Sequence, residues 1–332
     1  AGRRFEPAER HQSLVPEAFG EDRAGVEIGV AGGGGDGEAG RQVGTADAAP
    51  GPCPARQRHA VRLPFTKMHG AGNDFVVVDH REPFLTRVPE ARAALFARIC
   101  DRRRGIGADG VLLLERDGAH DFCMRYHNSD GGIAEFCGNG ARCIARFALT
   151  LGLGAGGRVR FGTDAGVKAA SLRADGRIAL EFGAVDFGTR ITLDACGRTF
   201  EGRHVRTGVP HLVLPVTGLA GIPFTDWSPA LRAHAALGPG GANVDYVELR
   251  DDGRVAMRTW ERGVEDETLA CGSGAIATAL WAVADGGRSS PVTVRTTGGD
   301  DLVVELVVRD GVREAVLVGP AVAVFTGEWQ DD

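Results

Sequence analysis

From position 61 onward, apolar residues come in short runs separated by turn residues, a pattern typical of β-strands. Runs at 75–79, 111–115 and 121–127 predict strands, and the last leads into the turn-rich segment 128–132. Apolar positions at helical spacing predict a surface-packed helix over 89–101. Three further strands are expected at 158–163, 166–173 and 177–182, where they would form a meander.

The pattern then repeats itself. The motif Cys-Gly-x-Gly-Ala begins at Cys137 and returns 134 positions later at Cys271, each time before an apolar run of helical character, the second reaching about Ala284. Segments 72–78 and 109–113 have counterparts at 208–214 and 245–249, both at an offset of 136. The pairs 124–125 with 257–258 and 175–176 with 310–311 lie at offsets of 133 and 135. This collinearity predicts two homologous halves.

Each half should place a mostly antiparallel sheet around a central helix, so the predicted fold class is α+β with two pseudo-symmetric domains. We expect the first domain at 61–183 and the second at 184–318, with 319–332 returning to the first. Residues 1–60 are rich in Gly and Ala and have no strand or helix periodicity. That composition predicts a disordered extension, or upstream sequence translated from a misplaced start.

Composition limits the classes of function. A net charge of −6 gives no case for nucleic-acid binding, and no apolar run approaches the ~20 residues that a membrane span needs. Seven cysteines without dense pairing favour a reducing cytoplasm. The chain has only two lysines, Lys67 and Lys168, neither in an obvious cofactor setting. No nucleotide-binding glycine motif and no zinc-ligand spacing is seen, so we expect neither a cofactor nor a metal.

The two repeated cysteines carry the candidate chemistry. A helix N-terminus presents free N–H groups and partial positive charge, which favour a thiolate and also bind carboxylates. The N-terminus of a helix stabilises a nearby negative charge by ~0.3–2 kcal/mol, enough to lower a thiol pKa from ~8.5 by about one unit. Cys137 and Cys271 are therefore expected to titrate near neutrality, one as base and one as acid. The remaining five cysteines are expected to be small buried hydrophobic residues.

Three segments, 67–75, 128–143 and 261–274, occur in the order and composition that resemble the diaminopimelate epimerase family. The resemblance extends from about 61 to 325. It implies a cofactor-independent isomerase that interconverts LL- and meso-2,6-diaminopimelate, in lysine and peptidoglycan biosynthesis, through two domains that close on the substrate. It implies a small-molecule substrate and a cytoplasmic enzyme, and it leaves a homodimer open.

Residue by residue, the resemblance implies that Cys137 and Cys271 are the catalytic acid/base thiols and that His211 and Glu261 adjust their pKa values. It implies that the substrate is bound by Asn73, Asn128, Gly138, Asn139, Asn243, Glu261, Arg262, Gly272 and Ser273. This chain departs from the family pattern at Val209, where many members have asparagine, and at Gly110, where some have glutamine. The segment from 261 to 271 is also one residue longer than its commonest form.

Three alternatives remain open at this point. A proline or hydroxyproline racemase resembles this fold and also uses paired cysteines, but its small cyclic substrate would not need Arg262 and Asn128. A phenazine-biosynthesis-type isomerase shares the fold and lacks the cysteine pair. An inactive amino-acid-binding protein would keep the hydrogen-bond donors and would need neither thiol.

Overall fold

The computed structural model describes residues 61–83, 89–134 and 136–331. The chain divides into two compact units, Ala1–Arg56 and Gln57–Asp332, and all described residues belong to the second. The prediction for residues 1–60 falls outside the described part of the chain.

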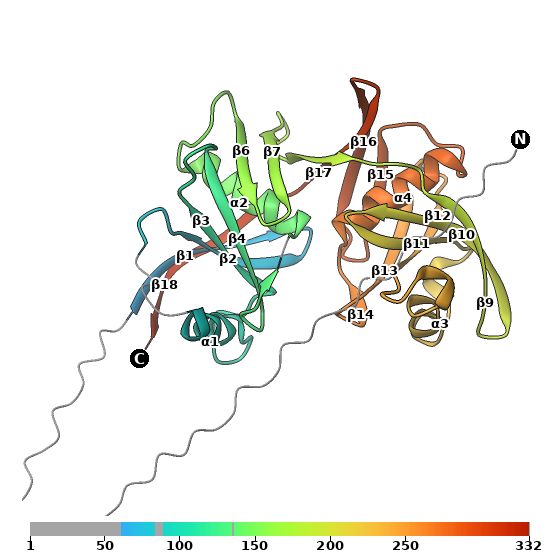
Figure 1. Cartoon of the computed structure of the whole chain (residues 1–332), viewed down its shortest axis with the longest axis horizontal. Helices are drawn as coiled ribbons and strands as arrows, with labels where there is room; N and C mark the ends of the chain where they lie inside the picture. Colours follow the sequence, from blue (N-terminus) through green and yellow to red (C-terminus); the bar gives the residue numbers. More distant parts are fainter. Residues whose placement is uncertain (1–60, 84–88, 135, 332) are drawn as a thin grey trace, which may run out of the picture. The chain divides into compact units, whose positions relative to one another are not determined.

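The first half of the fold contains eight strands and two helices among its described residues (Figure 1). In chain order they are β1 (Val61–Gly70), β2 (Asn73–Asp79), α1 (Pro89–Cys100), β3 (Gly110–Glu115), β4 (Phe122–Asn128), β5 (Ile133–Ala134), α2 (Gly138–Thr150), β6 (Arg158–Thr163), β7 (Gly166–Leu172) and β8 (Ile178–Ala184). The helix predicted over 89–101 and the meander predicted from 158 are confirmed.

The second half repeats this order after one extra strand. It comprises β9 (Thr189–Ala195), β10 (Arg198–Thr207), β11 (Val209–Pro215), α3 (Phe224–Arg232), β12 (Asn243–Leu249), β13 (Val255–Glu261), β14 (Asp266–Thr268), α4 (Gly272–Ala284), β15 (Val292–Arg295), β16 (Asp301–Arg309), β17 (Val312–Gly319) and β18 (Val322–Asp331). Two short 3-10 turns, η1 (Leu219–Gly221) and η2 (Ala235–Leu237), flank α3.

All described strands join in one sheet, and most neighbours are antiparallel. The parallel pairs are β2 with β3, β4 with β6, β11 with β12 and β13 with β15. Each parallel pair is separated in sequence by a helix, as parallel connections require. The α+β prediction, with two repeated halves and a mostly antiparallel sheet around a central helix in each, is confirmed.

Each half is completed by a strand that follows the last strand of the other half in the chain. β8 and β17 pair antiparallel with each other and so join the halves. β9, which follows β8, pairs with β10, whereas β18, which follows β17, pairs with β1. The predicted domain boundaries lie close to the ends of β8 and β17, and they stay a prediction.

The strand register corrects one part of the sequence repeat. Parallel pairing places Phe75 beside Gly110 in the first half and His211 beside Asn243 in the second. Because Phe75 and His211 are 136 positions apart, Gly110 corresponds to Asn243 at an offset of 133. The match of 109–113 with 245–249 at an offset of 136 is therefore wrong. The second copy is three residues shorter than the first between these strands, where its helix is also shorter.

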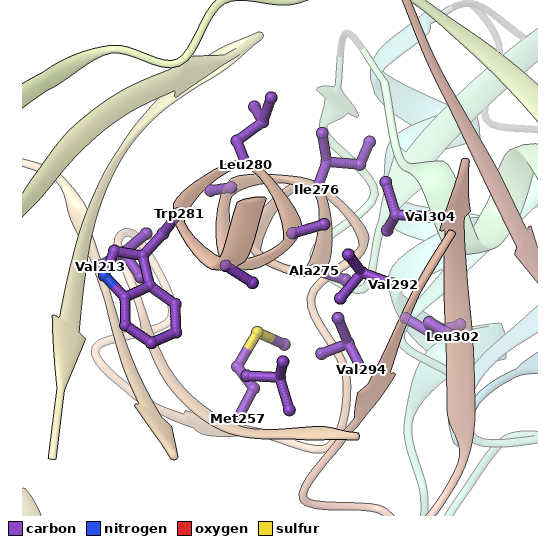
Figure 2. Packing of buried hydrophobic residues seen from close by; sticks show 14 of the residues in the cluster. Val213, Met257, Ala275, Ile276, Leu280, Trp281, Val292, Val294, Leu302 and Val304 are labelled. Atoms are coloured by element: carbon purple, nitrogen blue, oxygen red, sulfur yellow. The ribbon is translucent and has the colours of Figure 1, made fainter. Parts of the chain in front are cut away.

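Each central helix lies in its own hydrophobic core. Figure 2 shows α4 nearly end-on, with Val213, Met257, Val292, Val294 and Leu302 around it. Ile276, Leu280 and Trp281 on the helix are at most 6% exposed, and burying a side chain of this kind contributes about 1.5–3 kcal/mol. The core around α2 is separate. These cores fix the positions of the two helix N-termini.

Within the described residues, no helix combines the length and the hydropathy that crossing a membrane would require.

Candidate active site

The N-termini of α2 and α4 meet. Cys137 and Cys271 are the residues immediately before these helices, and both have extended backbone. A Cβ built on Gly272 would lie 4.0 Å from the Cα of Gly138, so the first turns of the two helices are almost in contact. Two cysteines that lie 134 positions apart in the sequence are thereby brought to the boundary between the halves.

Cys137 is partly buried and its sulfur donates a hydrogen bond to Oδ1 of Asn73, at 3.5 Å. The amide nitrogen of Asn73 donates to the Asp109 carboxylate, which leaves the amide oxygen facing the thiol. Burial raises the pKa of Cys137 to about 11, although N–H groups of Gly140 and Asn139 act in the opposite direction.

Cys271 is 6% exposed, and its sulfur accepts the Gly274 N–H at 3.4 Å. The Ser273 hydroxyl lies 3.4 Å from the same sulfur. Burial raises the pKa of the Cys271 thiol well above its ordinary value, and the carboxylates of Glu261 and Asp245 raise it further.

The prediction that helix N-termini bring both thiols near neutrality is therefore wrong for this structure. The N–H groups act in the expected direction, but desolvation disfavours a buried thiolate more strongly. The expectation for the other cysteines holds in part, because Cys100 and Cys143 are buried and Cys123 is partly buried. Cys196 is exposed, in the turn between β9 and β10, and Cys53 lies outside the described residues.

A buried histidine and aspartate lie next to Cys271. His211 and Asp245 are both 0% exposed, and Nδ1 of His211 is 2.7 Å from Oδ2 of Asp245. Nε2 of His211 is 3.0 Å from the Ser273 hydroxyl and 3.3 Å from the amide nitrogen of Asn243. The second oxygen of Asp245 accepts a hydrogen bond from the Thr259 hydroxyl at 2.7 Å.

The equivalent strand positions in the two halves carry different chemistry. In the second half, His211 pairs with Asn243, and Asn243 and Glu261 flank the paired residues Val244 and Trp260. The same row in the first half holds Phe75, Gly110 and Asn128. Glu261 is partly buried, and this burial raises the pKa of its carboxyl. Within this row of strand positions, the acid–base groups therefore lie in the second half.

Asn139 and Arg142 connect the N-termini of α2 and α4 through buried hydrogen bonds. The amide nitrogen of Asn139 donates to the Ala270 carbonyl across the boundary, at 3.1 Å. Its amide oxygen accepts from the guanidinium of Arg142 at 2.9 Å. Arg142 is 0% exposed and also donates to the Pro320 and Gly138 carbonyls. Within the described residues no carboxylate pairs with it, and burial lowers its pKa.

Not every residue expected at the site contacts the cysteine pair. Asn128 is exposed at the end of β4, and the Arg262 guanidinium donates to the Gly240 carbonyl at 3.4 Å. Among the described contacts, Arg262 reaches the residues around His211 through its backbone N–H, which donates to Oδ1 of Asn243 at 2.7 Å. Val209 opens β11 and offers no polar side-chain atom.

Sequence reasoning missed three charged residues that hold the site, namely Asp109, Arg142 and Asp245. For Asp245 the available signal was a carboxylate between Val244 and Tyr246, in the part of β12 where the other side chains are apolar. For Arg142 it was an arginine on the buried side of an amphipathic helix.

Comparison with solved structures defines the class of fold. A hydroxyproline epimerase from Agrobacterium vitis matches with a TM-score of 0.57 and 17% identity, over 81% of this chain and 92% of its own. A phenazine biosynthesis protein of the PhzF family from Enterococcus faecalis matches with a TM-score of 0.62 and 15% identity, over 81% of this chain and 99% of its own. The chain thus shares its fold with a hydroxyproline epimerase and with a phenazine biosynthesis protein.

Sequence comparison identifies the family within this class. The family model described as diaminopimelate epimerase matches residues 65–188 and 203–324. Diaminopimelate epimerase from Aquifex aeolicus is 36% identical over 278 residues, covering 81% of this chain and 99% of that protein. The enzyme of the same name from Gemmatimonas aurantiaca is 39% identical over 252 residues, covering 74% and 88%. The chain belongs to the diaminopimelate epimerase family.

Proposed function

We propose that this chain is an amino-acid epimerase that interconverts LL- and meso-2,6-diaminopimelate by two-base proton transfer between Cys137 and Cys271. The observation that carries the proposal is the meeting of two cysteine-capped helix N-termini, one from each half. Thiols supplied from opposite halves suit a reaction that removes a proton from one face of a carbon and adds one to the other.

The helix N-termini would bind the carboxylate next to the reacting carbon. Backbone N–H groups of Gly138, Asn139, Gly272 and Ser273 lie in the first turns of α2 and α4. Oriented N–H groups and two helix dipoles favour the charge that develops as the α-proton leaves, without reorganising. Holding the rest of the substrate is the role proposed for Asn73, Asn128, Asn243, Glu261 and Arg262.

The proton steps follow from this arrangement. One cysteine, as thiolate, takes the α-proton, and the electron pair of the broken C–H bond delocalises into the carboxylate. The thiol of the other cysteine gives its proton to the opposite face. The two cysteines have then exchanged protonation states, and the reverse reaction uses them in exchanged roles. His211 and Glu261 are proposed to adjust the thiol pKa values from the Cys271 side.

We place the enzyme in the cytoplasm, in lysine and peptidoglycan biosynthesis, acting without pyridoxal phosphate and with a homodimer as its proposed assembly. The positions of the two lysines support the cofactor-independent mechanism. Lys67 is buried in an ion pair with Asp74 at 2.7 Å, and Lys168 donates to the Phe182 carbonyl at 2.9 Å. Neither amine is oriented toward the cysteine pair by these contacts.

The test is a coupled assay that detects meso-diaminopimelate formed from the LL isomer, with L-proline as the alternative substrate. We expect turnover of diaminopimelate alone, and loss of turnover in Cys137→Ala and in Cys271→Ala. Racemisation of proline without turnover of diaminopimelate would refute the proposed substrate. Full activity in either cysteine variant would refute the mechanism.

A further inference from the structure

Three side chains form a continuous path that leads away from Cys271. The Cys271 sulfur is 3.4 Å from the Ser273 hydroxyl, which is 3.0 Å from Nε2 of His211. Nδ1 of the same ring is 2.7 Å from the Asp245 carboxylate. Asp245 and His211 are completely buried, so the path ends inside the protein rather than in solvent.

The contacts around His211 determine which ring nitrogen carries the proton. Oδ1 of Asn243 accepts the backbone N–H of Arg262, so the atom of Asn243 that faces the ring is the NH₂ donor. Nε2 must then accept, and Nδ1 carries the hydrogen that is donated to Asp245. Asp245 can only accept here, because Thr259 donates to its other oxygen. The lone pair of Nε2, which accepts from the Asn243 amide, thus also faces the Ser273 hydroxyl.

We propose that Asp245 is a positioning residue that holds His211 as the proton acceptor for Cys271, with the Ser273 hydroxyl between them. The resting enzyme then has Cys271 as thiolate, although burial disfavours a lone thiolate there, because the proton stays beside it on His211 as an ion pair; Cys137 remains a thiol. This inference rests on the proposed function, and it assigns unequal roles to two cysteines that the sequence repeat presents as equals.

The proton transfer is balanced. The S–H bond of Cys271 breaks as its proton passes to the Ser273 oxygen, while the Ser273 proton passes to Nε2 of His211. The electron pair stays on sulfur, and nothing is oxidised or reduced. Loss of the proton to solvent would instead leave two negative charges, on Cys271 and Asp245, beside the Glu261 carboxyl. Transfer to His211 keeps the net charge of the buried group unchanged, which avoids most of the desolvation cost.

Among the described residues, which leave out position 135, no histidine or carboxylate is hydrogen-bonded to Cys137. Its neighbour is the amide oxygen of Asn73, which accepts a hydrogen bond from the thiol but cannot take its proton. The charged groups that act on Cys137 are Glu261 and Arg142, and those that act on Cys271 are Glu261 and Asp245. A base that lies one hydroxyl away therefore distinguishes Cys271 from Cys137.

The experiment measures alkylation of each cysteine by iodoacetamide in the full chain, as a function of pH and without substrate. Peptide mapping by mass spectrometry separates Cys271 from Cys137 and from the exposed Cys196. In the unsubstituted protein we expect Cys271 to react faster than Cys137 at neutral pH. In Asp245→Asn, the Cys271 rate near pH 7 should fall about tenfold or more, since the His211 imidazolium loses its buried counter-charge, an effect of roughly 1–3 pKa units. The proposal requires this loss to outweigh the removal of the repulsion that Asp245 exerts on the Cys271 thiolate.

Two variants provide the comparison. Asp109→Asn makes the same chemical change on the Cys137 side, and it should leave the Cys271 rate unchanged. Ser273→Ala keeps the backbone N–H and removes only the hydroxyl. It should slow Cys271 to a similar extent, and combining it with Asp245→Asn should add little, because both changes interrupt one path.

An unchanged Cys271 rate in both Asp245→Asn and Ser273→Ala would overturn the proposal, as would an equal fall at Cys137. If Asp245→Asn does not fold, as judged by circular dichroism, the Ser273→Ala rates decide the question. Alkylation requires no substrate, so failure of this proposal is distinct from failure of the epimerase assay.

Discussion

Two equivalent glycines should respond very differently to alanine. Gly140 and Gly274 occupy the same place in the two Cys-Gly-x-Gly motifs, in the first turn of α2 and α4. A Cβ on Gly274 would stand 2.6 Å from Oδ1 of Asp245, closer than such atoms approach in proteins. A Cβ on Gly140 would meet only methyl groups of Leu112 at 3.2 and 3.4 Å and a ring carbon of Phe75 at 3.4 Å.

The cost follows from what can move. Asp245 cannot retreat without losing its hydrogen bonds to Thr259 and His211, and overpacking of a rigid site costs about 1–3 kcal/mol. The leucine methyls at Gly140 need to move by only a few tenths of an ångström. Replacing glycine by alanine also favours a helix by up to ~1 kcal/mol. We expect Gly274→Ala to be destabilised by about 1–2 kcal/mol and Gly140→Ala to be nearly neutral.

Calorimetry and urea unfolding of the two variants measure this difference. A loss of 1 kcal/mol should lower the melting temperature of a chain this size by about 2–4 °C. Gly274→Ala should also lower the alkylation rate of Cys271, because the displaced Asp245 no longer orients His211. Equal melting temperatures in the two variants would refute the argument, since they would mean that the Asp245 carboxylate yields as readily as a leucine methyl.

Three more predictions concern the reaction, acid stability and the buried arginine. When a single isomer reacts in D₂O, early product should carry deuterium at the inverted centre while recovered substrate stays protiated. Mass spectrometry measures this labelling. Equal labelling of product and substrate would contradict the two-base mechanism with Cys137 and Cys271. Burial alone would raise the pKa of Asp74, but hydrogen bonds from Arg102 and Lys67 outweigh it and hold the pKa at about 2. A lowered pKa stabilises the fold above about pH 4, and the effect is lost as pH falls toward 2. Asp74→Asn should therefore lower the urea midpoint at pH 7, by about 1–2 kcal/mol in free energy, and the difference from the unsubstituted chain should shrink below pH 4. Arg142→Met leaves three oxygen acceptors without their charged donor, and each buried unsatisfied group costs about 1–3 kcal/mol of stability. We expect the substitution to reduce kcat more than it raises KM. A change confined to KM would show that the guanidinium acts only on substrate binding.

Local sequence predicted the elements around the site better than it predicted their environment. The starts of α2 and α4 were recognisable because a cysteine between glycines and an apolar run are contiguous signals. The raised thiol pKa values were not predictable, because burial depends on strands distant in the sequence. The repeat of the element order implied a helix in the place of α3, but its own nine residues, which include Pro229, are too short a stretch to show a helical period. Asp109 and Asp245 contact Asn73 and His211, neighbours brought to them by parallel pairing, which sequence spacing does not show.

The pairing of β1 with β18 constrains how the chain folds during synthesis. Val61 pairs with Asp331, so the edge of β1 that pairs with β18 stays unpaired until almost the whole chain has been synthesised. At translation rates of ~5–20 residues per second, the β1 edge stays open for tens of seconds after β1 leaves the ribosome. An open edge is a template for wrong pairing. The charged and proline residues along this strand, Arg62, Pro64 and Lys67, are of the kind that blunts such an edge. The β18-facing edge of the nascent first half therefore stays exposed to wrong pairing until β18 is synthesised.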